Sequence, residues 1–252
     1  MTRVIAVSNQ KGGVGKTTSV QNVAASLTYK DFKVLMIDLD PQGNLSFISG
    51  ADNESRPTVY EALRGDIGIT EALQHTKNGD IVPANILLSG ADREFTKPNL
   101  LRDKLGPIKA GYDYILIDTP PSLGILTINA LTAADSVIIP ISADVLGLQG
   151  LSQLYDTIVE VQKHSNPKLY IEGILFTQYN ARTLLTREFT KATKQAAKRM
   201  KTKVFDTTIR ASVATREAQA HQTDVLSYSK ISPTADDYNA VTIEIIKGGR
   251  TK

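Results

Sequence analysis

The chain has 252 residues, of which 41% are hydrophobic and 22% are charged, and its net charge is +3. These values are typical of a globular domain and exclude a disordered chain, and no apolar run approaches the roughly 18 residues of a membrane-spanning helix. The chain has no cysteine, which excludes disulfides and thiolate metal sites, and its first dozen residues leave no room for a secretory signal, so a cytoplasmic location is expected.

Short aliphatic runs alternate with helix-length segments along the whole chain. The runs that predict strands are Val4–Ser8, Val34–Ile37, Tyr114–Ile117, Val137–Ile141 and Tyr170–Phe176. Helical spacing of apolar residues predicts helices over Thr17–Tyr29, Ile125–Ala134, Leu148–Lys163, Leu184–Met200 and Pro233–Ile246. Near-continuous apolar strands separated by helices predict an α/β fold. We expect a three-layer sandwich, with a mostly parallel, twisted sheet between helices on both faces, in one domain over residues 1–252.

Residues 45–110 show a weaker pattern. Thr58 is expected to cap a short helix that runs through Leu63. Ile86–Leu88 is expected to form a further strand, because it is a short apolar run. The region has no linker long enough to divide the chain, which supports the single-domain interpretation.

A glycine-rich segment stands between the first predicted strand and the first predicted helix. Its residues are Lys11, Gly12, Gly13, Val14, Gly15, Lys16, Thr17 and Thr18. It departs from the general phosphate-loop pattern because Gln10 occupies the first glycine position. Glycines still let backbone N–H groups turn into the loop, above the positive end of the helix. Lys16 is therefore expected to reach the β- and γ-phosphates of a nucleotide, and the Thr17 hydroxyl is expected to bind Mg²⁺. The alternative is a glycine-rich turn with a surface lysine.

Two later strands are followed by aspartates, at the edge where a parallel sheet gathers its active site. Asp38 and Asp40 come after the second predicted strand, and Asp118 comes after the third. Mg²⁺ is usually held by few carboxylates together with waters and phosphate oxygens, so these three residues predict a magnesium and phosphate site. A single aspartate at such a position could instead be a helix cap or a turn former.

The glycine-rich segment resembles the deviant phosphate loop of the ParA/MinD family of ATPases, in which an additional lysine opens the loop. Residues 38–44 are similar to that family's first switch, and residues 118–124 are similar to its second. The resemblance spans nearly the whole chain and is closest to the Soj/ParA partitioning type without an N-terminal helix-turn-helix domain. It implies a P-loop fold and a slow, partner-stimulated hydrolysis of ATP to ADP that depends on Mg²⁺.

The resemblance also implies roles for single residues. Lys11 would cross the interface of a nucleotide-dependent homodimer and contact the phosphates in the partner subunit, while Lys16 binds those of its own subunit. Asp40 would orient the attacking water. Asp38 would hold Mg²⁺ through water, and Asp118 would support it from the outer coordination shell.

Later parts of the chain match the family more loosely. Residues 209–218 look like the segment after the family's penultimate strand, which frequently has proline where Arg210 stands. Gln178 and Arg210 lie where relatives contact adenine. Both residues are therefore expected near the base of the nucleotide.

Positive charge is concentrated between Arg182 and Lys203, where eight basic residues accompany one acidic residue. Helical spacing places five of them on one face: Arg187, Lys191, Lys194, Lys198 and Lys201. Such a face can meet a phosphate backbone, and no base-reading motif accompanies it, so non-specific binding of double-stranded DNA is expected. The alternative is the solvated side of an amphipathic helix. Its apolar side would include Leu184, Ala192, Ala196 and Met200.

The expected function is DNA partitioning. An ATP-bound sandwich dimer would bind DNA of the nucleoid, and a ParB-like centromere-binding protein would stimulate hydrolysis and release the dimer, with no membrane partner. A MinD-type, membrane-associated division regulator needs a C-terminal amphipathic helix, for which the residues after Ile246 are too few. A metabolic ligase, such as one of the biotin pathway, would need a substrate pocket in place of the DNA face. A nitrogenase-reductase role is excluded, because cluster ligation requires cysteine.

Overall fold

The computed structural model describes residues 2–143 and 147–248. The strands are β1 (Arg3–Val7), β2 (Val34–Asp38), β3 (Gln74–Thr76), β4 (Gly79–Val82), β5 (Tyr114–Asp118), β6 (Ser136–Ser142) and β7 (Tyr170–Thr177). The α-helices are α1 (Lys16–Thr28), α2 (Asn44–Ile48), α3 (Val59–Arg64), α4 (Ala91–Glu94), α5 (Leu100–Leu105), α6 (Ile125–Ala133), α7 (Gly147–His164), α8 (Leu184–Arg199), α9 (Val213–Ala220), α10 (Val225–Tyr228) and α11 (Pro233–Gly248). Short 3₁₀ helices are η1 (Ile69–Ala72), η2 (Ile86–Gly90) and η3 (Lys109–Gly111).

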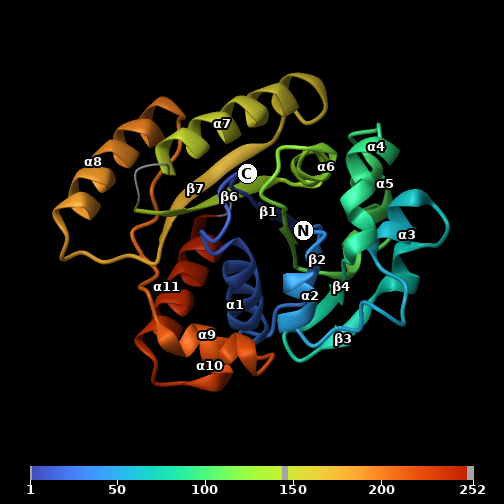
Figure 1. Cartoon of the computed structure of the whole chain (residues 1–252), viewed down its shortest axis with the longest axis horizontal. Helices are drawn as coiled ribbons and strands as arrows, with labels where there is room; N and C mark the ends of the chain where they lie inside the picture. The colour runs from blue at the N-terminus through green and yellow to red at the C-terminus, as the bar shows by residue number, and fades with distance from the viewer. Residues whose placement is uncertain (1, 144–146, 249–252) are drawn as a thin grey trace.

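The strands form a single sheet in the order β3-β4-β2-β5-β1-β6-β7, and neighbouring strands are parallel except in the β3–β4 hairpin. Figure 1 shows this sheet between two groups of helices. The register pairs Asp38 with Asp118 on adjacent strands. Because parallel strands end at the same edge, the two carboxyl groups lie together at the carboxyl end of the sheet.

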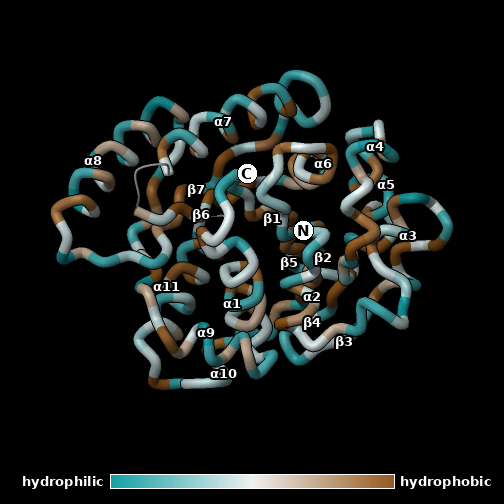
Figure 2. The backbone as a smooth tube through the Cα atoms, viewed as in Figure 1, coloured by the Kyte–Doolittle hydropathy of each residue, from teal (hydrophilic) through white to brown (hydrophobic). Residues whose placement is uncertain are grey.

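The central strands send alternate side chains to opposite faces of the sheet, as strand geometry requires. In β2, Leu35 and Ile37 belong to a core that includes residues of α3, α5, α6, α7 and α8. Val34 and Met36 belong to a second core with residues of α1, α10 and α11. Figure 2 shows the apolar residues gathered along the central strands. Burial on both faces explains why the sequences of these strands are continuous apolar runs. The predicted three-layer α/β fold is confirmed.

The predicted strands and helices outside residues 45–110 are present, with ends that differ by no more than two residues. The cap at Thr58 is confirmed, since its hydroxyl accepts from the backbone N–H of Tyr60 and its own N–H donates to the Glu61 carboxylate. No helix in the ranges that the structure describes is long and apolar enough to cross a membrane. The prediction of an absent C-terminal anchor rests partly on residues 249–252, which lie outside the described residues.

The strand predicted at Ile86–Leu88 is wrong, because these residues begin the 3₁₀ helix η2. The Asn85 side chain accepts a hydrogen bond from the backbone N–H of Leu87, and this favours a turn over a strand. The strand beside β2 is instead β4, which begins at Gly79 with φ of +106°. A Cβ atom at Gly79 would lie 2.5 Å from the Val34 carbonyl oxygen, so only glycine fits this hairpin.

Candidate active site

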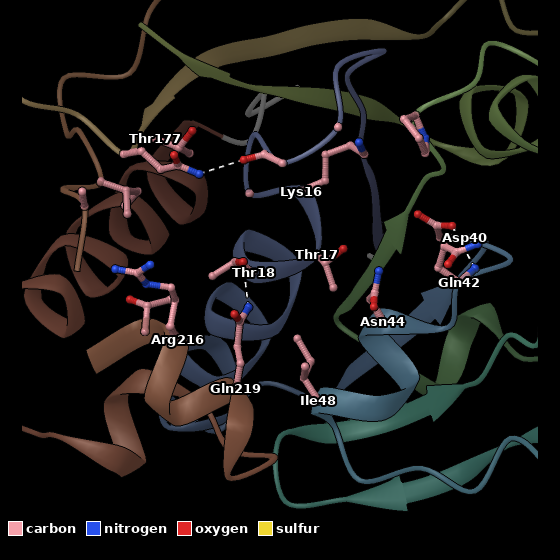
Figure 3. Close-up of a pocket in the computed structure, with 18 of the residues that line it drawn as sticks. Lys16, Thr17, Thr18, Asp40, Gln42, Asn44, Ile48, Thr177, Arg216 and Gln219 are labelled. Carbon is pink, nitrogen blue, oxygen red and sulfur yellow. Dashed lines mark hydrogen bonds between the residues drawn. The ribbon is translucent and has the colours of Figure 1, made fainter. Parts of the chain in front are cut away.

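A cavity of ≈ 930 Å³ opens at the carboxyl end of the sheet, in front of the loop between β1 and α1 (Figure 3). Its lining residues come from within segments 12–18, 40–48, 120–122, 177–178 and 209–219, and from Tyr238. The predicted residues that line it are Gly12, Gly13, Gly15, Lys16, Thr17, Thr18, Asp40, Gln178 and Arg210. In the described part of the chain, Lys11, Val14, Asp38 and Asp118 support this wall from outside the lining. The cavity therefore brings together the predicted phosphate loop, both switch segments and the predicted base contacts.

The loop is held by glycine conformations and by the end of β7. Gly13 and Gly15 have left-handed φ angles of +73° and +80°, which non-glycine residues rarely adopt. Thr177 Oγ1 donates to the Val14 carbonyl oxygen at 2.8 Å, and Gln178 Nε2 donates to that of Gly13 at 2.7 Å. Gly15 precedes α1 without a side-chain cap, so the first N–H groups of the helix stay available at the cavity. The loop thus presents the positive end of α1 to an anion.

Lys16 is the buried cation of this wall. Its side-chain Nζ donates to the Lys11 carbonyl oxygen at 3.3 Å. Burial lowers the pKa of Lys16, while the nearby carboxylates of Asp118 and Asp40 act in the opposite direction. A phosphate group entering the cavity would meet a desolvated ammonium, for which electrostatic attraction is strong.

Asp38 organises the segment that follows β2. One carboxylate oxygen accepts from the backbone N–H and the hydroxyl of Ser46, at 2.9 and 2.8 Å, and the other accepts from the backbone N–H of Asp40 at 3.0 Å. Burial raises the pKa of Asp38 to about 6. Asp40 lines the cavity, and its own carboxylate accepts from the backbone N–H of Gln42 at 3.0 Å. Asp38 therefore fixes the loop that presents Asp40.

Thr17 and Asp118 form the part of the site that suits a cation. Thr17 Oγ1 donates to Asp118 Oδ2 at 2.6 Å. Asp118 Oδ1 is buried and has no hydrogen-bond partner among the described residues. Burial, followed by the charge of Asp38, raises the pKa of Asp118. A buried carboxylate oxygen without a partner is costly, so this corner fits Mg²⁺ and its waters, with the hydroxyl lone pairs of Thr17 as ligand.

The wall opposite the loop contains residues that the sequence patterns do not identify. Thr215, Arg216 and Gln219 on α9 line the cavity. Thr215 and Arg216 lie in the family-like segment 209–218 but have no predicted role, and Gln219 lies just outside that segment. The predicted base contact Arg210 also lies here, and its Nε and Nη2 bind both carboxylate oxygens of Asp237 at 2.7 and 2.8 Å. Arg210 is therefore tied to α11 as well as exposed to the cavity.

The predicted DNA-binding residues are separate from the cavity, on α8 and just beyond its end. All five basic side chains are exposed, and Lys201 follows the end of the helix with a left-handed φ of +53°. Leu184 is predicted on the apolar side but is 71% exposed, because it is the first residue of the helix and no described residue covers it. The buried side of the helix consists of Thr186, Phe189, Thr193 and Ala197. Figure 1 shows α8 at the outer edge of the molecule, beside α7 and β7.

Comparisons with known proteins agree with this geometry. The AAA domain family model matches residues 2–171. The sporulation initiation inhibitor protein Soj of Bacillus subtilis is 41% identical, over 99% of this chain and 100% of its own length. The chromosome partitioning protein ParA of Myxococcus xanthus is 40% identical, over 97% of this chain and 88% of its own. The crystal structure of cobyrinic acid a,c-diamide synthase from Mycobacterium smegmatis, with bound ADP and magnesium, is 36% identical with a TM-score of 0.86, over 100% of this chain and 96% of that one. The chain therefore belongs to the ParA/MinD family of P-loop ATPases and, within it, to the Soj type.

Proposed function

We propose that this chain is a DNA-partitioning ATPase that binds ATP and ADP, with Mg²⁺, in the cavity between the phosphate loop and α9. The observation that carries the proposal is the bond between Thr17 and Asp118 beside the buried Lys16, on one wall of that cavity. A hydroxyl, a carboxylate and an ammonium in this arrangement suit a triphosphate with its cation. The likeness to chromosome partitioning proteins, and to a structure with ADP and magnesium, supports the same function.

Each residue of this wall has a distinct role in the proposal. Lys16 would neutralise charge on the β- and γ-phosphates, and Thr17 would bind the cation while Asp38 and Asp118 hold its waters. Thr17, Asp38 and Asp118 would hold a Mg²⁺ ion, which when bound would supply positive charge beside the phosphates. Asp40, at the cavity surface, would orient the attacking water. A centromere-binding partner of the ParB type would raise a slow basal rate by reordering the segment that carries Asp40.

Lys11 is proposed to complete the site in a homodimer. Its backbone lies at the start of the loop, where its carbonyl oxygen accepts from the Lys16 ammonium. Lys11 of each subunit would reach the phosphates bound by the other, so ATP would favour the dimer. Lys11→Ala is expected to keep its ADP affinity and to stay monomeric with ATP, as measured by light scattering. Dimers of Lys11→Ala at the wild-type level would contradict this role.

A short path joins the phosphate loop to the basic face of α8. Thr177 and Gln178 bond to loop carbonyls, and residues 179–183 lead from them into the helix. A nucleotide that reshapes the loop can therefore shift α8. In the dimer, two basic faces would bind one DNA duplex, and the linkage raises the overall affinity.

The test is retention on non-specific duplex DNA with ATP, with ADP and without nucleotide. Wild-type protein is expected to bind tightly only with ATP, and Lys16→Ala in none of the three conditions. Affinity should fall steeply with salt, because phosphate contacts release counterions. Equal retention under all conditions would contradict the nucleotide switch.

A matched pair of variants tests whether DNA binding depends on the basic face of α8 or only on the net charge of the protein. The triple variant Lys191→Gln, Lys194→Gln and Lys198→Gln is expected to lose DNA binding and keep nucleotide binding. The control triple variant Lys97→Gln, Lys163→Gln and Lys168→Gln removes the same charge from other exposed positions. If both triple variants lose DNA binding equally, the α8 face is not the DNA site.

A second candidate is ATP-dependent amide synthesis, which the similarity to the Mycobacterium enzyme favours. The sequence contains no cysteine to release ammonia from glutamine, so it would have to use free ammonia or a partner subunit. The test is ADP release with cobyrinic acid and ammonium against ADP release with duplex DNA. Stimulation only by the acid and ammonium would replace the partitioning proposal.

A further inference from the structure

Two neighbouring threonines in the first turn of α1 have different hydrogen-bond roles: the hydroxyl of Thr17 is a donor and that of Thr18 is an acceptor. Thr17 Oγ1 donates its proton to Asp118 Oδ2 at 2.6 Å. Thr18 Oγ1 instead accepts from the side-chain amide Nε2 of Gln219 at 2.8 Å. Figure 3 shows Thr18 and Gln219 joined across the cavity from α1 and α9, with Thr17 turned to the other side. Both threonines line the cavity.

The two bonds give these hydroxyl groups opposite chemistry. A hydroxyl has one proton and two lone pairs. The proton of Thr17 is used on the carboxylate, so its lone pairs remain for a cation. Thr18 already accepts a bond, so its proton remains for an acceptor in the cavity. The positive end of α1 makes an anion the favoured acceptor there.

The direction of each side chain indicates which phosphate it meets. Thr17 faces Asp118, on the side of the cation and the outer phosphates. Thr18 faces α9, which begins three residues after Arg210, a predicted base contact, so the nucleoside is expected on this side. The phosphate next to the nucleoside is the α-phosphate, which ATP and ADP share.

We propose that Gln219 is a positioning residue for the nucleotide: its amide holds the Thr18 hydroxyl as a hydrogen-bond donor to the α-phosphate. The inference rests on the proposed nucleotide function and adds a residue to that site. It also explains how α9, 201 positions later in the chain, takes part in phosphate binding. A chain of two hydrogen bonds, from amide to hydroxyl to phosphate, is stronger than its parts because each bond polarises the next.

The two hydrogen bonds from Gln219 to Thr18 and from Thr18 to the phosphate have a fixed donor direction, which substitutions of Gln219 can test. Gln219→Ala is expected to weaken ADP and ATP binding equally, by about five- to tenfold. Gln219→Glu is expected to weaken both further, because its carboxylate accepts the Thr18 proton and repels phosphate. The hydrolysis rate at saturating ATP should change less than twofold in Gln219→Ala. The control Glu217→Ala, an exposed position on the same helix, should bind as wild type does.

Titration calorimetry with ADP and Mg²⁺ decides the proposal. It compares the wild type with both Gln219 variants, with Thr18→Val, and with the double variant Thr18→Val with Gln219→Ala. If Gln219 acts through Thr18, then Gln219→Ala has no further effect in the Thr18→Val background. Wild-type affinity in both Gln219 variants, or the same loss with and without the Thr18 hydroxyl, overturns the role of Gln219 and leaves the nucleotide function intact. Failure of the wild-type protein to bind ADP overturns the nucleotide function itself. Thermal unfolding without nucleotide identifies any variant that is misfolded, and Gln219→Glu then supplies the isosteric comparison.

Discussion

The phosphate loop and the α9 wall face each other across one cavity, but the chain builds them by different means. The loop consists of consecutive residues whose shape follows from left-handed glycines and from the start of a helix. The α9 wall depends on distant contacts. Its neighbour Val225 donates to the Asn22 side chain at 2.8 Å, and Arg210 is bound to Asp237. One wall is specified locally and the other by the tertiary fold.

This difference separates two kinds of substitution. In the loop, a change acts through backbone strain or through the lost charge of Lys16. On the opposite wall, a change acts through a contact between elements that are far apart in sequence. Substitutions on the two walls should therefore differ in whether they change ligand affinity, stability or both.

The largest effect is expected for Lys16→Ala. The variant removes the buried ammonium that would bind the β-phosphate of ADP, and a charged hydrogen bond contributes about 1.5–3 kcal/mol, so ADP affinity should fall by about 10- to 100-fold. Calorimetry in magnesium buffer measures this loss. Lys163→Ala, an exposed lysine paired with Glu160, is the control and should bind normally. A loss below about threefold in Lys16→Ala would mean that the loop does not hold the phosphates.

The locally specified wall is also the part of the site that sequence patterns reveal. Strand, glycines, lysine and helix are consecutive, so Gly12 to Thr18 are identified without a structure. Asp38 and Asp118 are found because parallel strands end at one edge. Gln219 and Thr215 are not found, because only the packing of α9 brings them to the cavity. The β3–β4 hairpin is missed for a related reason, since β3 is polar, β4 has only two apolar residues, and the close approach of Gly79 to Val34 is a tertiary contact.

The next effect concerns Thr177, which joins the loop to the end of β7. Thr177→Val keeps the shape but leaves the Val14 carbonyl oxygen without its 2.8 Å bond, in a fully buried position. A buried acceptor without a partner costs about 1–3 kcal/mol of unfolding free energy, which urea titration measures. Thr177→Ser keeps the hydroxyl and should lose less. If Thr177→Val is as stable as the wild type while Thr177→Ser is destabilised, the methyl packing matters and the hydrogen bond does not.

Glycine conformation in the loop gives a smaller effect. Gly15→Ala forces alanine into φ of +80°, with its Cβ 3.7 Å from the Thr177 side chain, and should lower stability by about 1–2 kcal/mol. Gly12→Ala is the matched control, since φ at Gly12 is not left-handed and a Cβ there meets open space. Its cost should stay within about 0.5 kcal/mol. Equal losses in nucleotide-free urea titrations would show that backbone conformation does not define this wall.

The smallest effect is expected at Arg210. Its side chain combines a structural contact, the ion pair with Asp237, with a predicted contact to the base of the nucleotide. The guanidinium edge is occupied by Asp237, but the side chain is 55% exposed, so solvent screens this ion pair and its removal should have little effect on stability. Asp237 also keeps the backbone N–H of residue 210 as a donor in Arg210→Ala. The guanidinium face remains free to stack on a base, and losing such a contact lowers ADP affinity by about two- to fivefold. Calorimetry on Arg210→Ala and Arg210→Lys, which cannot stack as a plane, measures that loss. If stability falls while ADP affinity does not, Arg210 only ties the wall to α11, and the base contact predicted from the sequence is wrong.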